Sequence, residues 1–346
     1  MRISIVVCVY DRADELRRCA SSLLASEHDD YEIVVVDDGS TDASADVARE
    51  LATASDGVLR LVQNPRNLGV SGARNAGIRA ARGDLILFVD SDCVVEPGWV
   101  AAYDDFFANH PGIGAASGRV VEPPPSTVAE RAYRGSGTIQ GSRLQRRRLM
   151  GCNMAFRRDW LVENVFDEAL DYGSDEDEIA WRLERDGLGV GFVPEASVEH
   201  HHRVDLRGYL REAFRLGRGA ARFGYKAGHG LNHDLWPITA ALCLLPAMLL
   251  DLRSGFLVGL CLLAQVGAIA VNESFLKGKD AKTTLALLPL GCVYYGVKAW
   301  GAWSTWVRIL AGGESRIRAS RAADRARRRE PLRPSDRGAA PLRGRP

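Results

Sequence analysis

The sequence predicts an α/β protein in which a doubly wound sheet with parallel strands is followed by apolar helices. Three observations support this prediction. Short β-branched runs alternate with amphipathic helical periods in the first half, which is the pattern of a parallel sheet. The apolar run at residues 85–89 ends in two carboxylates, Asp90 and Asp92, at the strand end where such sheets bind ligands. From residue 235 the composition becomes strongly apolar.

The first half alternates strands and helices as a doubly wound sheet requires. Continuous β-branched runs are typical of strands that are covered on both faces. The expected strands are residues 3–9, 32–36, 59–62 and 85–89. The expected helices between them are residues 14–24, 42–52 and 70–81.

After Asp92 the alternation is less regular. The expected elements are a helix at 99–109, a strand at 114–120, a strand that starts at Gly151, a helix at 179–186 and a strand at 190–194. Between them, the basic stretch 131–148 is expected to be a mobile flap. Four consecutive acids, Asp175–Glu178, stand before the helix at 179–186. The helix dipole favours acids there, but four exceed what capping needs.

Asp90 and Asp92 are candidates for binding a divalent cation. The residues that follow Asp90 lead into Pro97-Gly98, so a turn is expected, and a turn can aim both carboxylates at one ion. Paired carboxylate oxygens with room for phosphate oxygens suit Mg²⁺ or Mn²⁺ better than zinc. A lone Asp-x-Asp is also common in ordinary turns and helix caps, so the rest of the chain must decide.

The apolar region predicts attachment to membrane lipids. Residues 235–252 and 255–271 each approach the roughly 17–25 residues of a bilayer span and are expected to form a hairpin, 235–271. Residues 283–310 are expected to be re-entrant or interfacial, with tryptophans as anchors. The basic tail, 314–346, is expected to be disordered and to bind anionic lipid. Three buried helices of a soluble domain are the alternative.

The expected organisation is an α/β domain over residues 1–220, membrane-associated helices over 235–310 and the basic tail. The seven cysteines form no C-x-x-C pair or disulfide framework, which indicates a reducing compartment. The first apolar run has only strand length, so no signal peptide is expected, and the α/β domain is placed at the cytoplasmic face of the membrane. Walker and dinucleotide motifs are absent, and the globular part is not basic, which argues against nucleic acid.

Several motifs follow one another between residues 3 and 217. They are Ile5–Arg12, Val35–Asp42, Asn67–Gly69 with Gly72–Gly77, Asp90–Asp92, Gly151–Ala155, Asp175–Leu183 and His200. In this order they resemble the motifs of family 2 glycosyltransferases with the GT-A fold. The resemblance implies a mixed sheet with a Rossmann-like nucleotide-binding half, and a nucleotide-sugar donor.

The resemblance also implies roles for the matching residues. Asp38 would hydrogen-bond the nucleobase, Asp92 with Asp90 and His200 would hold the metal and the diphosphate, and Asp175 or Glu176 would be the general base. Contacts to the nucleotide are implied for Cys8, Tyr10, Asp11, Asp38, Arg74, Asp90 and Ser91.

Two residues or motifs depart from the family pattern. Asp11 stands where asparagine is usual, and the acidic motif reads Asp-Glu-Asp-Glu, which leaves the identity of the base open. No Gln-x-x-Arg-Trp follows His202, which argues against a processive polysaccharide synthase.

The sequence therefore predicts a metal-dependent, inverting glycosyltransferase that acts on a glycan or lipid-linked acceptor hydroxyl in cell-envelope glycan or glycolipid synthesis. A divalent cation would neutralise the leaving diphosphate, and a carboxylate would take the proton of the hydroxyl. Two alternatives remain. A polyprenyl-phosphate glycosyltransferase would need little deprotonation of its acceptor, and a catalytically silent GT-A module would act as the scaffold of an envelope complex.

Overall fold

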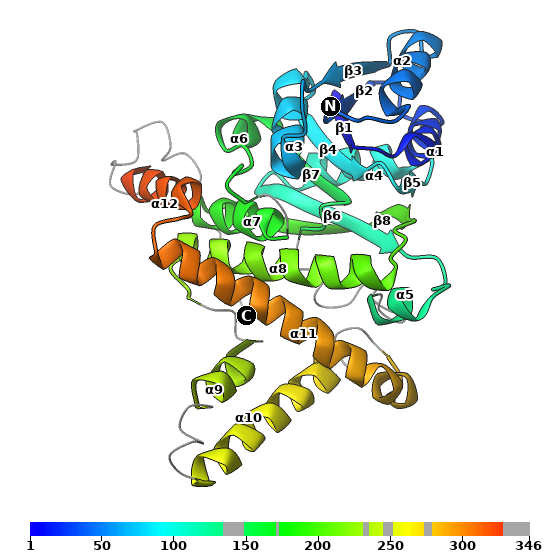
Figure 1. Cartoon of the computed structure of the whole chain (residues 1–346). Coiled ribbons are helices and arrows are strands. Elements are labelled where there is room, and N and C mark those ends of the chain that lie inside the picture. The colour runs from blue at the N-terminus through cyan, green and yellow to red at the C-terminus, as the bar shows by residue number, and fades with distance from the viewer. Residues whose placement is uncertain (134–148, 171–172, 231–234, 245–251, 273–278, 328–346) are drawn as a thin grey trace.

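An eight-stranded mixed sheet organises the chain, with strand order β3-β2-β1-β4-β7-β6-β8-β5 (Figure 1). The computed structural model describes residues 1–133, 149–170, 173–230, 235–244, 252–272 and 279–327. The expected basic flap lies mostly at 134–148 and so falls outside the described residues. The mixed doubly wound sheet confirms the α/β part of the predicted fold class.

The nucleotide-binding half expected from the sequence is present as four parallel strands. They are β1 (Ile3–Val9), β2 (Tyr31–Asp37), β3 (Leu59–Gln63) and β4 (Leu85–Asp90). The helices that connect them are α1 (Ala13–Leu24), α2 (Ser44–Ala54) and α3 (Gly69–Ala80). Because the strands are parallel, the carboxyl ends of β1, β2 and β4 meet at one edge of the sheet.

The second half of the sheet is mainly antiparallel. Its strands are β5 (Cys93–Val95), β6 (Ile113–Val121), β7 (Asn153–Arg157) and β8 (Gly189–His200). β7 runs antiparallel to β4 and β6, and β5 runs antiparallel to β8. The sequence prediction missed β5, which has three residues, and ended β8 at residue 194. The β5–β8 pairing matters because it sets Cys93 opposite His200, one residue beyond Asp92.

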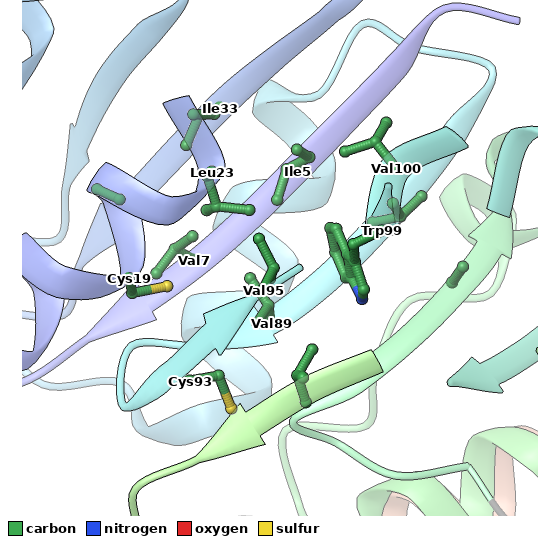
Figure 2. Packing of buried hydrophobic residues seen from close by; sticks show 14 of the residues in the cluster. Ile5, Val7, Cys19, Leu23, Ile33, Val89, Cys93, Val95, Trp99 and Val100 are labelled. Carbon is green, nitrogen blue, oxygen red and sulfur yellow. The ribbon is translucent and has the colours of Figure 1, made fainter. Parts of the chain in front are cut away.

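Alternate side chains of the central strands fill two separate cores. Ile5 and Val7 pack with α1, α2 and α4 (Trp99–Asn109) on one face of the sheet, and Figure 2 shows the contacts with residues of α1 and α4. Val6 and Val34 face the other way, toward α3, α6 (Arg158–Glu163) and α7 (Asp175–Arg185). The strands are therefore apolar on both sides, as the continuous β-branched runs predicted.

Asn153 of β7 is a buried polar junction within the second half of the sheet. Its carbonyl oxygen accepts hydrogen bonds from Trp99 Nε1 and the Tyr103 hydroxyl, and its amide donates to the backbone oxygens of Arg119 and Ala196 at 2.9 Å. The four partners lie on three elements of the second half, namely α4, β6 and β8. A fully satisfied buried amide of this kind fixes the register between α4, β6, β7 and β8.

The remaining helices cover one side of the sheet and extend away from it. They are α5 (Val128–Tyr133), α8 (Leu206–Ala227), α9 (Trp236–Leu244), α10 (Leu252–Val271), α11 (Ala281–Leu310) and α12 (Ser315–Arg327). α11 lies along α8, and α9 and α10 lie below α11 in Figure 1, away from the sheet. The approach of α11 to α8 is close: a Cβ on Gly217 would stand 1.9 Å from the backbone oxygen of Lys298.

The expected membrane hairpin of residues 235–271 is not confirmed. In the part of the chain that the structure describes, no helix combines the length and the apolar character that crossing a membrane requires. α9 and α10 are separate helices, and residues 245–251 between them lie outside the described part. The segment 283–310, expected to be re-entrant or interfacial, forms most of the continuous helix α11, which follows α8 because small residues line the contact.

The first part of the basic tail corrects another expectation. Residues 315–327 form the helix α12, whereas 314–346 was expected to be disordered. Ile317 is buried with Leu170 and Ile309, and Arg185 pairs with Asp324 at 3.0 Å. Apolar contacts and an ion pair to α7 thus order a stretch that its composition alone suggests is unstructured. Residues 328–346 lie outside the described part.

Stability is expected to depend on pH through Glu32. This buried carboxylate accepts from Ser4 Oγ at 2.6 Å, Arg60 Nε at 3.1 Å and Arg82 N at 2.7 Å. Burial alone would raise the pKa of Glu32, but these donors lower it below its ordinary value. Its stabilisation is therefore complete above the ordinary glutamate pKa, about 4.3, and is lost as pH falls through the lower value in the folded state.

We predict that Glu32→Gln lowers the free energy of unfolding by about 1–3 kcal/mol at pH 7, because a buried donor loses its partner. Urea unfolding at several pH values measures this change. The difference between wild type and variant should shrink as the pH is lowered. A difference that stays constant would contradict the assignment.

Candidate functional site

Asp92 lies in the turn after β4 and is surrounded by positively charged or basic groups. Arg12 Nη1 donates to Asp92 Oδ2 at 2.7 Å, His200 Nε2 lies 3.3 Å from Oδ1, and His202 Nδ1 lies 3.5 Å from Oδ2. Burial alone would raise the pKa of Asp92, but the two histidines and Arg12 hold that pKa well below its ordinary value. Asp92 is therefore ionised in a nearly buried position.

Asp90 does not share these partners. Its carboxylate lies 3.8 Å from Arg74 Nη2, whereas the group whose ligand atoms all lie within 4.8 Å of one another is Asp92, His200 and His202. In this geometry Asp90 lies beside Arg74 and outside that group, and the expectation that Asp90 and Asp92 aim at one cation stays a prediction. Residues at i and i+2 share a face only in a continuing strand, and the chain turns at Ser91.

Arg74 brings together acids that are about a hundred residues apart in sequence. It projects from α3 and is buried, and Nη1 donates to Asp175 and, at 3.4 Å, to Glu176 of α7. With Asp90 on its other side, one guanidinium bridges the carboxyl end of β4 and the start of α7. The two acidic motifs found in the sequence thus face each other across Arg74.

The four acids of α7 occupy different environments. Asp175 is buried, and burial together with Glu176 raises the pKa of Asp175 well above its ordinary value, against the charge of Arg74. Glu176 keeps 24% of its side chain exposed. Glu178 is completely buried in ion pairs with Arg182 and Lys226, so its role is to hold α7 in place.

Gly151 lets the neighbouring chain pass close to Glu176 and Arg74. A Cβ at this position would stand 2.0 Å from Glu176 Oε1 and 2.5 Å from Arg74 Nη2. Gly151 lies in the turn before β7, and the backbone of this turn therefore passes directly beside both groups. Any larger residue at position 151 would displace one of them.

The residues expected to contact the nucleotide lie at the same edge of the sheet, but several already have protein partners. Asp38 accepts hydrogen bonds from Asn64 Nδ2 and from the backbone amides of Leu68 and Gly69, so it shapes the 64–69 loop. Asp11 Oδ1 similarly accepts from Thr41 N at 2.7 Å. Both carboxylates thus organise loops, and the contact of Asp38 with a nucleobase remains a prediction.

Three further predicted residues differ in exposure. Tyr10 is 45% exposed and free to meet a planar ligand, whereas Ser91 is buried in the turn beside Asp92. Burial raises the pKa of Cys8 to about 12, so it is a neutral thiol at the end of β1, near Arg74.

Sequence analysis missed the roles of Arg12, His202 and Glu212. Arg12 stood in the first motif without a role, and the structure places it on Asp92. His202 is two residues beyond His200, and this alternation in an extended chain was the available signal. Glu212 lies on α8, which was not predicted, so no local signal connected it with the histidines.

The donor set at Asp92 fits a divalent cation. One carboxylate oxygen and two imidazole nitrogens converge there, and such sets bind first-row divalent metals. Cys93 and Cys152 form a second group with His200, but burial raises the pKa of the Cys93 thiol well above its ordinary value, which disfavours the thiolate that metal ligation needs.

Comparison with known proteins shows which family the first part of the chain resembles. A family model described as Glycosyl transferase family 2 matches residues 4–164. The uncharacterized glycosyltransferase alr2836 of Nostoc is 45% identical over 98 residues, which are 28% of this chain and 30% of that protein. The glucosyl-dolichyl phosphate glucuronosyltransferase of Haloferax volcanii is 30% identical over 173 residues, 47% of this chain and 55% of that protein. The chain thus covers only part of each relative.

A solved structure shares the fold. The mannosyltransferase PcManGT from Pyrobaculum calidifontis, in complex with GDP-Man and Mn²⁺, matches with a TM-score of 0.54 and 19% identity, over 95% of this chain and 88% of that one. The sheet of this protein is therefore a GT-A-like sheet. Residues 4–164 are thus similar to glycosyl transferase family 2, and the sheet has the fold of that mannosyltransferase.

Proposed function

We propose that the protein is an inverting, metal-dependent glycosyltransferase that moves a sugar from a nucleotide-diphosphate donor to an acceptor hydroxyl in cell-envelope glycan or glycolipid synthesis. The observation that carries the proposal is the bridge that Arg74 makes between Asp90 and the pair Asp175 and Glu176. It puts an acidic group next to the strand end that also carries Asp92. A leaving-group site and a base are thereby neighbours.

As the diphosphate leaves, negative charge develops on its oxygens, and positive charge near Asp92 would stabilise it. A divalent cation bound by Asp92 and His200 would supply Lewis-acid stabilisation of the phosphate oxygens. The side chain of Arg12, which is 40% exposed, lies at the same carboxylate and adds a positive charge there. Arg74, held by three acids, fixes the side of the site on which the sugar would lie.

Glu176 is the better candidate for the general base, and Asp175 for a positioning residue. A base must reach the acceptor hydroxyl, and Glu176 is partly exposed whereas Asp175 is buried against Arg74. Burial and Glu176 raise the pKa of Asp175 against the charge of Arg74, and its contact with Arg74 holds the guanidinium beside Glu176. The proton of the acceptor would go to Glu176 as the new glycosidic bond forms and the bond to the diphosphate breaks.

The acceptor is proposed to be glycan or lipid-linked. The Haloferax relative is named for a transfer to glucosyl-dolichyl phosphate, which is a lipid-linked sugar. A hydroxyl acceptor of that kind needs a base, and the chain provides Glu176. A polyprenyl-phosphate acceptor needs no general base. A partly exposed acid such as Glu176 therefore favours a hydroxyl acceptor over a phosphate acceptor.

Exposed apolar side chains support binding of the protein to a lipid surface. Phe256 and Leu263 on α10 and Trp300 on α11 are 75%, 70% and 64% exposed. On α11 the exposed positions Leu285, Val293, Trp300 and Val307 recur at helical spacing and form one stripe, on a helix whose other side packs on α8. We propose that this stripe and α10 rest on the cytoplasmic face of the membrane.

A panel of nucleotides tests the donor site. We expect one nucleoside diphosphate among UDP, GDP, CDP and dTDP to raise the melting temperature in the presence of Mn²⁺ and to do so much less in EDTA. Asp92→Asn should abolish the Mn²⁺-dependent part of the shift. Equal shifts with every nucleotide, or none with any, would count against a nucleotide-sugar transferase.

Glu176→Gln tests the base. We expect kcat to fall by a factor of about 10²–10⁴, because general-base help is lost, while Mn²⁺-dependent nucleotide binding stays unchanged. Glu184→Gln is the matched control, since Glu184 is exposed at the far end of the same helix. Retention of kcat in Glu176→Gln would favour a phosphate acceptor or another base.

Flotation with neutral phosphatidylcholine vesicles tests the lipid surface. Neutral lipid excludes attraction between the basic tail and anionic headgroups. We expect the wild-type chain to float with the vesicles and the double variant Leu263→Gln, Trp300→Gln to lose most of this binding. The control is Val162→Gln, Val165→Gln, at exposed apolar positions near α6. Equal flotation of both variants would refute the assigned surface.

A further inference from the structure

His202 lies between two carboxylates, those of Asp92 and Glu212. Its Nδ1 lies 3.5 Å from Asp92 Oδ2, and its ring stacks beside His200 with centroids 5.5 Å apart and an interplanar angle of 21°. His201, between them, turns away: its Nε2 lies 3.5 Å from Glu199. Two of the three imidazoles thus converge on the same carboxylate, one on each of its oxygens.

The other nitrogen of His202 has a support of its own. Nε2 lies 3.7 Å from Glu212 Oε2, and Glu212 Oε1 accepts from the Tyr133 hydroxyl at 2.7 Å. The ring of Tyr133 also leans on the ring of His202, with centroids 5.4 Å apart. A histidine with one nitrogen at the metal position and the other at a buried carboxylate is the arrangement that orients metal ligands in proteins.

The fold holds Glu212 at this place. α8 starts at Leu206, directly after the histidine segment, and the Asp205 side chain caps it by accepting from Gly208 N. Six residues into the helix, Glu212 is nearly buried between α5 and His202. The Tyr133 hydroxyl holds one oxygen of the Glu212 carboxylate, so the other oxygen is kept in place beside His202.

We propose that His202, oriented by Glu212 and Tyr133, is a third protein ligand of the divalent cation at Asp92, and that the resulting set of two imidazoles and one carboxylate makes the site prefer Mn²⁺ to Mg²⁺. The inference rests on the proposed function, which supplies the cation. Mg²⁺ prefers carboxylates and phosphate oxygens, whereas imidazole ligands suit softer first-row metals. Three ligand positions would remain for diphosphate oxygens and water.

Mn²⁺ binding to the full chain tests the inference without a turnover assay. Free Mn²⁺ is measured by electron paramagnetic resonance during titration, alone and with saturating UDP or GDP. We expect His202→Ala to raise the Mn²⁺ Kd about 10–100-fold and Glu212→Gln to raise it by a smaller factor. The matched control, His201→Ala, should leave the Kd unchanged. Competition by Mg²⁺ should become stronger in His202→Ala.

A spectroscopic count separates ligation from a structural role. Electron spin echo modulation at saturating Mn²⁺ should show two coordinated imidazole nitrogens in wild type and one in both His202→Ala and His202→Gln. Two nitrogens in a folded His202 variant, or one in wild type, would overturn the inference even if the Kd changed. Failure of the proposed function is distinct, since the wild-type chain would then bind no Mn²⁺ with any nucleotide and Asp92→Asn would change nothing.

Discussion

A buried positive charge, that of Arg74, is the constraint on which the site depends. An unpaired guanidinium in the protein interior would be strongly destabilising, and here three carboxylates surround it. They come from β4 and from α7, so compensating one charge fixes two distant segments relative to α3. Phe166 adds a ring 5.3 Å from the guanidinium carbon. The same contacts that make Arg74 tolerable in the interior therefore bring the acidic motifs together.

Three of the four adjacent acids of α7 have different roles. Glu178 has a structural role, because its carboxylate is buried in ion pairs with Arg182 and Lys226 and anchors α7 to α8. Asp175 is enclosed with Arg74, and only Glu176 of that pair remains partly open to solvent. The sequence of the motif indicates an acidic site, but it does not indicate which acid is accessible. The burial of each acid decides which one can meet a substrate.

The sequence predicted the first half of the sheet well because each strand is signalled locally, by a β-branched run with a polar end. It failed where the cause is not local. β5 is too short to have a pattern, although its pairing with β8 sets His200 beside Asp92. α8 was missed, and with it Glu212. The ordering of α12 depends on Ile317 and Asp324 meeting α7 and α11, and no composition rule contains those contacts.

The C-terminal helices are connected to the metal position by packing. Leu287 and Tyr294 of α11 form one apolar cluster with Ala129 and Ala132 of α5, and Tyr133 at the end of α5 holds Glu212. Among the described residues, this cluster and the Tyr133–Glu212 hydrogen bond connect α11 with the partner of His202. On the proposed lipid surface, α11 would hold the catalytic edge of the sheet at a fixed height above the membrane. A lipid-linked acceptor would then reach Glu176 by lateral diffusion, without leaving the bilayer.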